Sequence, residues 1–381
     1  MSILRILSAT ILLGVLITAH FALSKQAEWN GTVSLPDVVT YSNTTLPDTD
    51  IPIDLPRTGI DGIDNYFRFM TSFFFSTLDS RNIRAHWQGN HLLGTLTSIW
   101  MLMLLEAHRK DRSGIFTLVT YFLEVVGELI GIGVATPLWC IIHLLVTLAP
   151  TRTNATKVLS TSGRDLKALG WALLFGHVVP TILMLRLEPD GEGIASQQIW
   201  TIARLFHPVF VYFFYKIIAV SSGKDRSPAR PAVNRSIYTF SILTSAFFHV
   251  TSMGFLLAFQ MFPGWLKQVV VIELDPKTVL VPVPFWSQEV VSKVPFATGV
   301  AIFLQWDYLC SSTAIVIWAT SLYLESTWLS LGDSSTLRTL GQAILVAVLA
   351  GPGAAAAFLM QERDATLVEV STVSISGKKV L

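Results

Sequence analysis

The sequence predicts an all-α, polytopic integral membrane protein, a helical bundle with about 7–9 transmembrane helices. The chain of 381 residues is 51% hydrophobic and only 14% charged, whereas soluble domains carry about 25% charged residues. Apolar runs close to the roughly 20 residues that a bilayer requires recur along the chain. The net charge of +1 and the lack of a basic stripe argue against nucleic-acid binding.

The N-terminal segment 1–23 is predicted to be a signal anchor or the first transmembrane helix. It has Arg5 near its start and a long apolar run without a clear cleavage site, which argues against a cleaved signal peptide. The next segment, 24–63, is polar and rich in Pro, Asp and Thr, as expected for a lumenal loop. Sequons at Asn30 and Asn43 predict glycosylation of this loop.

The segment 64–360 is predicted to form a multi-helix membrane domain that holds the catalytic site. Its first part, 64–80, is aromatic but too short to span a bilayer, so it fits an interfacial helix. Pro137 is predicted to break the helix at Thr136, which makes 114–149 a tight hairpin or a re-entrant turn. The predicted spans cover about residues 89–106, 114–134, 136–149, 166–186, 197–220, 237–262, 296–324 and 338–360.

Charge along the connecting loops predicts their side of the membrane. Lysine and arginine are concentrated in the loops 106–112, 151–167 and 221–236, which should therefore face the cytosol. The loop 188–198 is acidic and should face the lumen. The loop 263–295 is rich in proline and is predicted to form an ordered lumenal cover over the helices.

The C-terminal tail, 361–381, is polar and ends in two lysines, Lys378 and Lys379, followed by two apolar residues. These lysines look like a dilysine retrieval signal, which predicts an endoplasmic-reticulum protein with a cytosolic C-terminus. Nine predicted spans, counting the N-terminal one, would instead place that terminus in the lumen. One of the two interpretations must be wrong, and a chance polar tail is the alternative.

Ionisable residues recur near the middle of five predicted spans. Glu124 lies ten residues into its span, about 15 Å deep at 1.5 Å per residue. Asp307 lies about as deep, and His177, His207 and His249 lie ten to thirteen residues into theirs. Such residues normally face the interior of a bundle or a cavity. The pattern predicts a shared polar site at the midplane.

Glu124 and Glu128 lie four residues apart and therefore share one helix face. Burial and mutual repulsion both disfavour two ionised carboxylates, so the pair is predicted to share a proton and to act as a Brønsted acid. Aromatic faces nearby would stabilise a carbocation. The residues predicted to contact the substrate are His177, Arg204, His207, His249, Trp139, Trp306 and Tyr308, with further aromatic groups at Phe206, Phe210, Tyr212, Phe247 and Phe248.

Each of these residues also has an ordinary structural explanation. A single histidine in a membrane helix is more often an interhelical hydrogen-bonding group than a ligand. His207 precedes Pro208, and the pair can belong to a helix kink. Arg204 can be a structural counter-ion for one of the acids. Gly127 and Gly131 form a small-residue packing motif that requires no ligand.

Other classes of site find less support in the sequence. The eight histidines are scattered, whereas membrane di-iron enzymes need them clustered. Ser-His-Asp groupings, P-loops and GxGxxG motifs do not occur in the sequence. Cys140 and Cys310 both fall in apolar runs and are predicted to be buried thiols without a disulfide or metal. No repeat halves of the kind expected for a transporter are visible.

Three stretches carry a resemblance to a known family: FLEVVGELIGIGVATPLWCIIHL (122–144), RLFHPVF (204–210) and FLQWDYLCSS (303–312). Through them, most of 60–360 resembles the fungal membrane-bound terpene cyclases of meroterpenoid pathways of the ascofuranone, ascochlorin and macrophorin kind. The resemblance implies an enzyme that protonates an epoxide or olefin of a farnesylated aromatic compound and guides carbocation cyclisation.

The same resemblance implies that Glu124, Glu128 and Asp307 are the acids and bases, and that neither a cofactor nor a metal is required. It implies a hydrophobic prenylated small-molecule substrate, drawn from the lipid bilayer, with a prenyltransferase and an epoxidase acting upstream. A proton-coupled small-molecule transporter is the alternative from another class, because midplane acids also suit proton coupling. A non-catalytic membrane scaffold is a third alternative, in which the acids would be dispensable.

Overall fold

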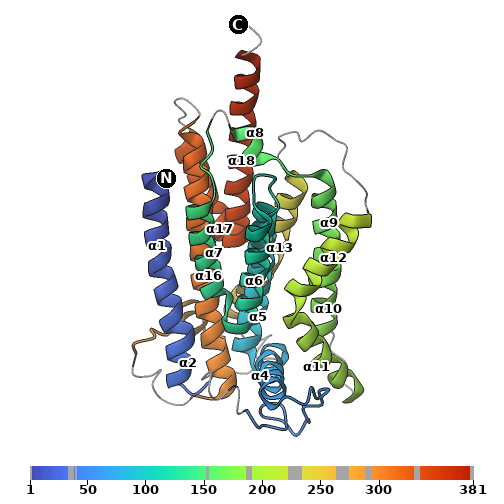
Figure 1. The fold of residues 1–381 in the computed structure, drawn as a ribbon. Coiled ribbons are helices and arrows are strands. Elements are labelled where there is room, and N and C mark those ends of the chain that lie inside the picture. Colours follow the sequence, from blue (N-terminus) through green and yellow to red (C-terminus); the bar gives the residue numbers. More distant parts are fainter. Residues whose placement is uncertain are drawn as a thin grey trace.

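The computed structural model describes residues 2–32, 38, 41–151, 154–185, 191–221, 234–262, 274–287, 294–329 and 335–377. Within these ranges the regular elements are helices, and the only β-type pairing is an isolated bridge between Thr45 and Pro52. The predicted all-α class is confirmed. Figure 1 shows the helices packed side by side, with α4 lying at one end of the bundle.

The N-terminal rod consists of α1 (Ile3–Ala19), the π-helix η1 (His20–Lys25) and α2 (Gln26–Trp29). It is followed by α4 (Asp61–Leu78). The remaining helices are α5 (Ile83–Ala107), α6 (Gly114–Ile130), α7 (Ile132–Val146), α8 (Ala155–Leu159), α9 (Gly163–Leu173), η2 (Leu174–Val178), α10 (Val179–Leu185), α11 (Gly191–Leu205), α12 (His207–Ser221), α13 (Arg235–Met261), α15 (Pro276–Leu280), α16 (Phe296–Thr327), α17 (Ser335–Ala350) and α18 (Pro352–Gly377).

The number of predicted spans, about 7–9, was too high. Among the described residues, four helical stretches are long and apolar enough to cross a membrane, or five if one bent pair counts as a single span. Several other helices are too short, since α6 has 17 residues, α7 has 15 and α17 has 16. The qualifying stretches are Ile3–Trp29, Lys157–Leu185, Arg235–Met261 and Phe296–Thr327, with the bent pair Gly193–Leu205 and His207–Ser221.

The hairpin predicted at 114–149 is present, but it turns at Gly131 rather than at Thr136. Gly131 has φ of 102°, a backbone conformation that only glycine adopts readily, and it separates α6 from α7. Helix α7 continues through Pro137. A proline removes one backbone hydrogen bond, which neighbouring helices in a bundle tolerate, whereas the reversal of the chain requires a positive φ.

The predicted span 338–360 is also a hairpin and not a single crossing. The chain reverses between α17 and α18 at Gly351, which has φ of 89° and is followed by Pro352. Because of this reversal, α17 and α18 run in opposite directions along the bundle. Figure 1 places the start of α1 and the end of α18 at the same end of the bundle. We call this the terminal end and the opposite one the α4 end.

The segment expected as a polar tail is helical as far as Gly377, because α18 extends through it. The proposed retrieval signal at Lys378 and Lys379 lies outside the described residues, and so does most of the proline-rich loop 263–295.

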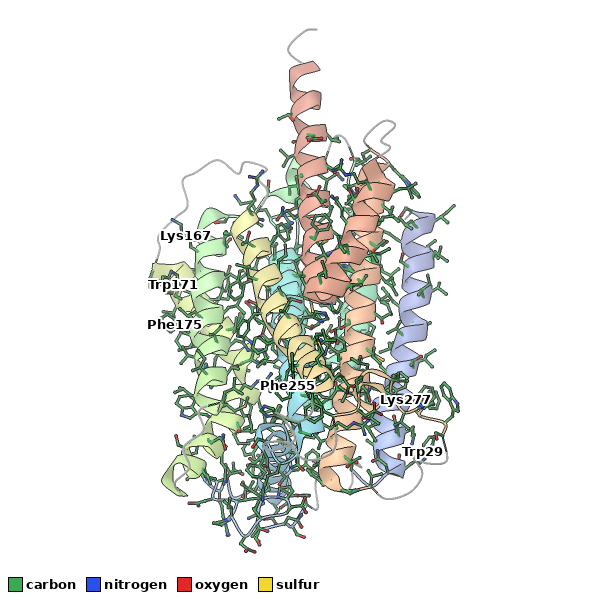
Figure 2. All side chains as sticks on the ribbon, turned by 180° about the vertical axis from the view of Figure 1, so that it is seen from behind. Trp29, Lys167, Trp171, Phe175, Phe255 and Lys277 are labelled. Atoms are coloured by element: carbon green, nitrogen blue, oxygen red, sulfur yellow. The ribbon has the colours of Figure 1, made fainter. Side chains whose placement is uncertain are left out.

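Large apolar side chains cover the outside of the bundle. On the outer side of η2 and α9, Trp171 is 54% exposed and stacks on Phe175, with ring centroids 5.9 Å apart. Figure 2 shows both side chains at the margin of the molecule. Exposed apolar surface of this extent fits contact with lipid. These helices therefore fit a membrane protein.

Helix α5 lies at the centre of the bundle and is buried along most of its length. It packs against α13, α16 and α18. Gly94 permits the close contact with α13, because a Cβ atom there would lie 2.4 Å from the Cβ of Phe248. Helix α5 contributes to both buried polar regions described below, with Leu92 and Leu96 at one and Glu106 at the other.

Candidate active site

A cavity of about 330 Å³ lies between the N-terminal rod, α4, α5, α16 and the α6–α7 turn. Its volume is near the lower limit of small-molecule pockets, which occupy about 300–1,000 Å³. Most of its wall is apolar or aromatic, and a few charged side chains interrupt it. It is lined by His20, Leu23, Ser24, Lys25, Glu28, Phe69, Met70, Phe73, Phe74, Leu92, Leu96, Gly127, Glu128, Leu129, Ile130, Gly131, Ile132, Arg204, Phe303, Leu304 and Asp307.

Asp307 reaches this cavity from α16 and is only 4% exposed. Its Oδ1 atom accepts a hydrogen bond of 2.6 Å from the backbone N–H of Gly133, in the first turn of α7. In the described part of the chain it forms no ion pair. A buried carboxylate normally has a cationic partner, so Asp307 is the lining carboxyl best suited to carry a proton.

The glycines of the α6–α7 turn make room for this carboxyl. A Cβ atom on Gly131 would lie 2.8 Å from Asp307 Oδ1, and one on Gly133 would lie 3.0 Å from it. The start of α7 can therefore approach Asp307 only because both positions lack a side chain. Gly131 was predicted to be a helix-packing residue. In the structure it forms the α6–α7 turn and lies beside Asp307.

Glu128 lines the cavity as one member of a buried ion pair. Its Oε2 atom accepts a hydrogen bond of 2.7 Å from Arg204 Nη1, and the two residues are 8% and 3% exposed. The guanidinium of Arg204 also lies 5.2 Å from the centroid of the Phe74 ring. The prediction of Arg204 as a counter-ion therefore agrees with its contact.

A bend in the helix places Arg204 at this position. Helices α11 and α12 meet at Phe206 at an angle of 69°. His207 begins α12, its Nδ1 lies 3.2 Å from the carbonyl oxygen of Arg204, and it is followed by Pro208. The kink expected at His207 and Pro208 is present, and it directs the end of α11 toward Glu128.

Glu124 lies one turn before Glu128 but does not line the cavity. It is 1% exposed, and its Oε1 atom has no hydrogen-bond partner. The structure records no hydrogen bond between the two carboxyls, and the partner of Glu128 is Arg204. Proton sharing between Glu124 and Glu128 therefore stays a prediction without a supporting contact.

His177 and His207 form a second cluster beside this site, around Trp100. The His207 ring lies 4.0 Å from the Trp100 ring and 4.8 Å from the His177 ring, between centroids. His177 Nε2 lies 3.0 Å from Thr97 Oγ1. His177 Nδ1 and His207 Nε2 are buried without a partner. Neither histidine lines the cavity.

The other predicted contacts lie elsewhere. His249 Nδ1 lies 3.0 Å from His91 Nε2, and the ring of Tyr308 lies 4.3 Å from that of His91. Trp139 donates to Thr120 Oγ1, and Trp306 donates to the Val283 carbonyl. The five midplane groups thus do not converge on one site. Of these five, only Asp307 lines the cavity.

Two walls of the cavity consist of residues that were not predicted to belong to the site. One is the aromatic face of α4, where Phe69, Phe73 and Phe74 lie. The other is the N-terminal rod, which contributes His20 and Lys25 among others. The run FRFMTSFFF was visible as an aromatic signal. Nothing in the sequence indicated that the N-terminal segment faces the site.

The described residues contain no group of three or more His, Cys, Asp or Glu side chains that could hold a metal ion. Of the two predicted glycosylation sites, Asn43 is exposed and Asn30 is 1% exposed. The Asn30 Oδ1 atom accepts a hydrogen bond from the Thr32 N–H. Glycosylation at either site stays a prediction.

Residues 8–368 of the chain match the CtvD domain family. The chain is similar to terpene cyclase ascI of Acremonium egyptiacum, with 26% identity over 333 residues that cover 84% of this chain and 82% of the relative. It is similar to terpene cyclase ctvD of Aspergillus terreus, with 25% identity over 331 residues that cover 85% and 89%. Terpene cyclase penA of Penicillium crustosum is 22% identical over 272 residues, which cover 70% and 72%. No solved structure gives a significant match.

Proposed function

The chain belongs to the CtvD domain family, and from that premise we propose that it is a membrane-bound terpene cyclase. Its substrate is a farnesylated aromatic, meroterpenoid-type intermediate, and the reaction begins with protonation of a terminal epoxide or olefin. The names of the relatives support cyclisation and do not favour the transporter. The resemblance of the sequence supports the substrate class, with a prenyltransferase and an epoxidase upstream and a location in the endoplasmic-reticulum membrane.

The observation that carries this proposal is that two carboxyl groups with different hydrogen-bond partners, Glu128 and Asp307, line one aromatic cavity. Glu128 has a guanidinium partner at 2.7 Å, whereas Asp307 accepts hydrogen bonds from the backbone at the start of α7, with the Gly133 N–H at 2.6 Å. When their surroundings keep one of two carboxyl groups protonated and the other ionised, the first can act as an acid and the second as a base. Asp307 is the acid in this assignment, and Glu128 remains an ionised carboxylate.

The proposed reaction follows from these two roles. Asp307 transfers a proton to the epoxide oxygen or to the terminal alkene carbon, and the alkene electrons of the chain then form ring C–C bonds. The faces of Phe73, Phe74 and Phe303 stabilise the migrating positive charge. Loss of a proton to a carboxylate, or attack by an internal hydroxyl, ends the sequence. The product is an isomer of the substrate.

The direct test supplies farnesylated phenols, with and without a terminal epoxide, to purified protein in detergent. We expect a product that has the same mass as the substrate, a different chromatographic retention time and at least one additional ring. Detergent removes the two compartments that a transporter requires, so turnover there is specific to the cyclase. Failure of every substrate, together with substrate-driven acidification of sealed vesicles, would favour the proton-coupled transporter.

Treatment with EDTA tests the non-metal mechanism. Because carboxyl groups supply the proton in this proposal, we expect the same rate of isomer formation before and after chelation, within about twofold. Protein washed with buffer alone is the control. Loss of activity that Mg²⁺ restores would contradict the proposal and point to an enzyme that handles a diphosphate.

A further inference from the structure

The cavity has one buried end and one open end. Asp307, Glu128 and Arg204 are all less than 9% exposed, so they mark the buried end. Lys25 and Glu28 also line the cavity, but their side chains are 45% and 50% exposed. The two form an ion pair of 3.1 Å, from Lys25 Nζ to Glu28 Oε2. His20, Leu129 and Ile130 are further exposed residues of the lining. The open side of the cavity therefore carries the Lys25–Glu28 ion pair, and its buried side carries the acid.

A π-helix brings the mouth residues to the cavity. The N-terminal rod changes from an α-helix to a π-helix over η1, and four of the six residues of η1 line the cavity. Short π-helical segments widen a helix by one residue and occur often at functional sites. Leu23, in the same segment, lies next to the turn, because a Cβ atom on Gly131 would be 3.2 Å from its Cδ1. The rod thus forms a continuous wall between the acid and the mouth.

The far end of the rod is held by a buried ion pair. Arg5 is 2% exposed, and its Nε and Nη2 atoms donate to Glu325 of α16 at distances of 2.7–3.0 Å. Its Nη1 atom donates to the carbonyl oxygen of Leu144 at 3.1 Å. A bidentate arginine–carboxylate contact fixes geometry as well as charge. The rod is therefore attached to the bundle at the terminal end and along the cavity.

The size and polarity of the cavity set the orientation of an amphiphilic substrate. About 330 Å³ suits an apolar chain better than a chain together with an aromatic core. Burial of a polar head without hydrogen-bond partners is costly, and the apolar chain gains from burial. An orientation with the chain inside and the head at the mouth satisfies both conditions.

Building on the proposed function, we infer that Lys25 binds the polar head of the substrate at the mouth of the cavity. The head carries an oxygen that accepts a hydrogen bond or bears negative charge, such as a phenol or phenolate. Lys25 then fixes the depth at which the reactive end of the chain meets Asp307. The π-helical segment makes the N-terminal rod a part of the substrate site as well as a membrane anchor.

The ordinary explanation of Lys25 and Glu28 is a solvated ion pair one turn apart on a helix. An ion pair as exposed as this one contributes little to stability. Replacement of Lys25 should therefore leave the protein folded under either explanation. Only the substrate-site explanation predicts a change that depends on the chemistry of the ligand head.

The experiment compares two ligands and four proteins in detergent. The ligands are a farnesylated phenol and its methyl ether, and binding is followed by tryptophan fluorescence. The proteins are the wild type, Lys25→Met, Lys25→Arg and Lys277→Met. Lys277 is exposed, does not line the cavity, and lies at the same end of the molecule as Trp29, as Figure 2 shows. It is thus a matched control for the loss of one lysine.

We expect the wild type and Lys277→Met to bind the phenol about tenfold more tightly than the ether, as one charge-assisted hydrogen bond allows. In Lys25→Met the ratio of the two dissociation constants, ether over phenol, should fall to about one, and Lys25→Arg should keep most of the wild-type ratio. An unchanged ratio in Lys25→Met, a ratio of one in the wild type, or no binding of either ligand would overturn the inference.

The proposed function and this inference fail separately. Binding that depends on Lys25 without formation of an isomer would reject the cyclase and keep the head-group site. Turnover with no effect of Lys25 on the ligand ratio would keep the cyclase and reject the site. Asp307→Asn should abolish turnover while it preserves the preference for the phenol, because the acid lies at the other end of the cavity.

Discussion

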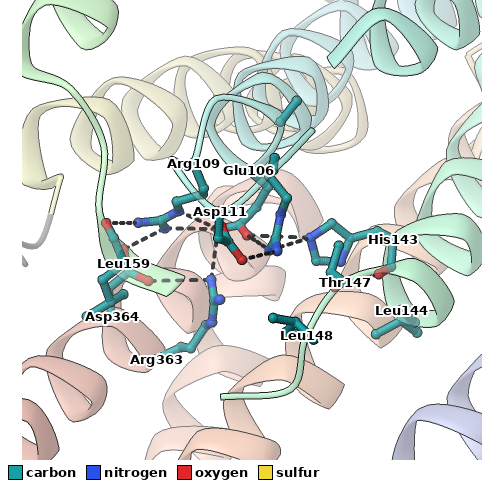
Figure 3. A network of polar contacts seen from close by, with 12 residues as sticks. Glu106, Arg109, Asp111, His143, Leu144, Thr147, Leu148, Leu159, Arg363 and Asp364 are labelled. Carbon is teal, nitrogen blue, oxygen red and sulfur yellow. Dashed lines mark hydrogen bonds and ion pairs between the residues drawn. The ribbon is translucent and has the colours of Figure 1, made fainter. Parts of the chain in front are cut away.

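Two buried polar regions of this protein contain the same kinds of residue but differ in how those residues are paired. At the terminal end, Glu106 and Asp364 are fully buried and contact arginines of α18 and of the loop that follows α5 (Figure 3). Arg109 Nη2 lies 2.9 Å from Glu106 Oε1 and 2.8 Å from Asp364 Oδ2. Arg363 Nη1 adds a contact of 2.8 Å to Glu106 Oε1. Near the α4 end, Glu128 and Arg204 form one ion pair beside a cavity, and Asp307 forms no ion pair with the residues that the structure describes.

The difference shows that a buried charge is not by itself evidence of a site. In the terminal network three carboxylates and three arginines compensate one another, and the arrangement joins α5 to α18. These residues are Glu106, Asp111, Asp364, Arg109, Arg112 and Arg363. At the cavity, Asp307 lines the empty volume and has no counter-ion within the described ranges. A buried acid without a counter-ion beside a cavity is suited to proton transfer to a ligand. A network in which every charge is paired holds helices together instead.

The same substitution in the two regions should produce opposite results, and the larger effect on activity concerns Asp307. Asp307→Asn keeps an oxygen that can accept the Gly133 N–H but removes the proton donor. We expect turnover to fall by about 10²–10⁴-fold, while the protein accumulates in membranes at the level of the wild type. Isomer formation per milligram of purified protein measures the effect. Near-normal turnover would remove Asp307 from the mechanism.

Asp364→Asn is the counterpart in the terminal network. It leaves Arg109 and Arg363 with one carboxylate fewer in a region without water access, and breaking a buried pair costs about 3–5 kcal/mol. That is a large part of a typical stability of about 5–15 kcal/mol. We expect a lower melting temperature and less protein in membranes, with unchanged turnover for each folded molecule. A stable but inactive Asp364→Asn protein would contradict the division between the two regions.

The two glycine turns allow a smaller and more local comparison. Gly131 and Gly351 both have positive φ, so alanine at either position strains the backbone by about 1–3 kcal/mol. The added Cβ would meet Asp307 Oδ1 at 2.8 Å in the first case and Ser245 Oγ at 2.9 Å in the second. We expect similar losses of thermal stability from Gly131→Ala and Gly351→Ala. Only Gly131→Ala should also reduce turnover per folded molecule. Equal turnover in the two variants would argue that Gly131 is not needed to make room for Asp307.

Glu124→Gln should have the smallest effect of the series. The residue is buried without a partner for Oε1, but it does not line the cavity. We expect a loss of turnover below about tenfold, compared with a larger loss for Glu128→Gln, which removes the partner of Arg204. Steady-state rates of the two purified variants decide the point. Complete inactivity of Glu124→Gln would restore the proton-sharing pair predicted from the sequence.

Sequence patterns identified the type of fold and part of the site. Apolar runs predicted the helices, and the helical rise placed Asp307 well inside one of them. In the structure Asp307 is a buried residue of α16. The cation expected for an acid was found at Arg204. The sequence could not show that Glu124 and Glu128, which share a helix face, have different neighbours. The hairpin at 114–149 was predicted, but its turn was placed at Thr136 instead of Gly131, and the reversal at Gly351 was missed. Gly131 and Gly351 differ from ordinary packing glycines only in φ.

The sequence alone determined that the chain is helical, that it is apolar enough for a membrane, and that acids are buried in it. These properties depend on composition and on the period of the helix, which are local. Only the tertiary structure decided which buried acid faces a cavity. That choice depends on where the chain reverses and on which distant segments then meet, such as Leu23 with Gly131 and Arg204 with Glu128. Contacts of this kind arise from packing between helices, and no pattern within a single helix specifies them.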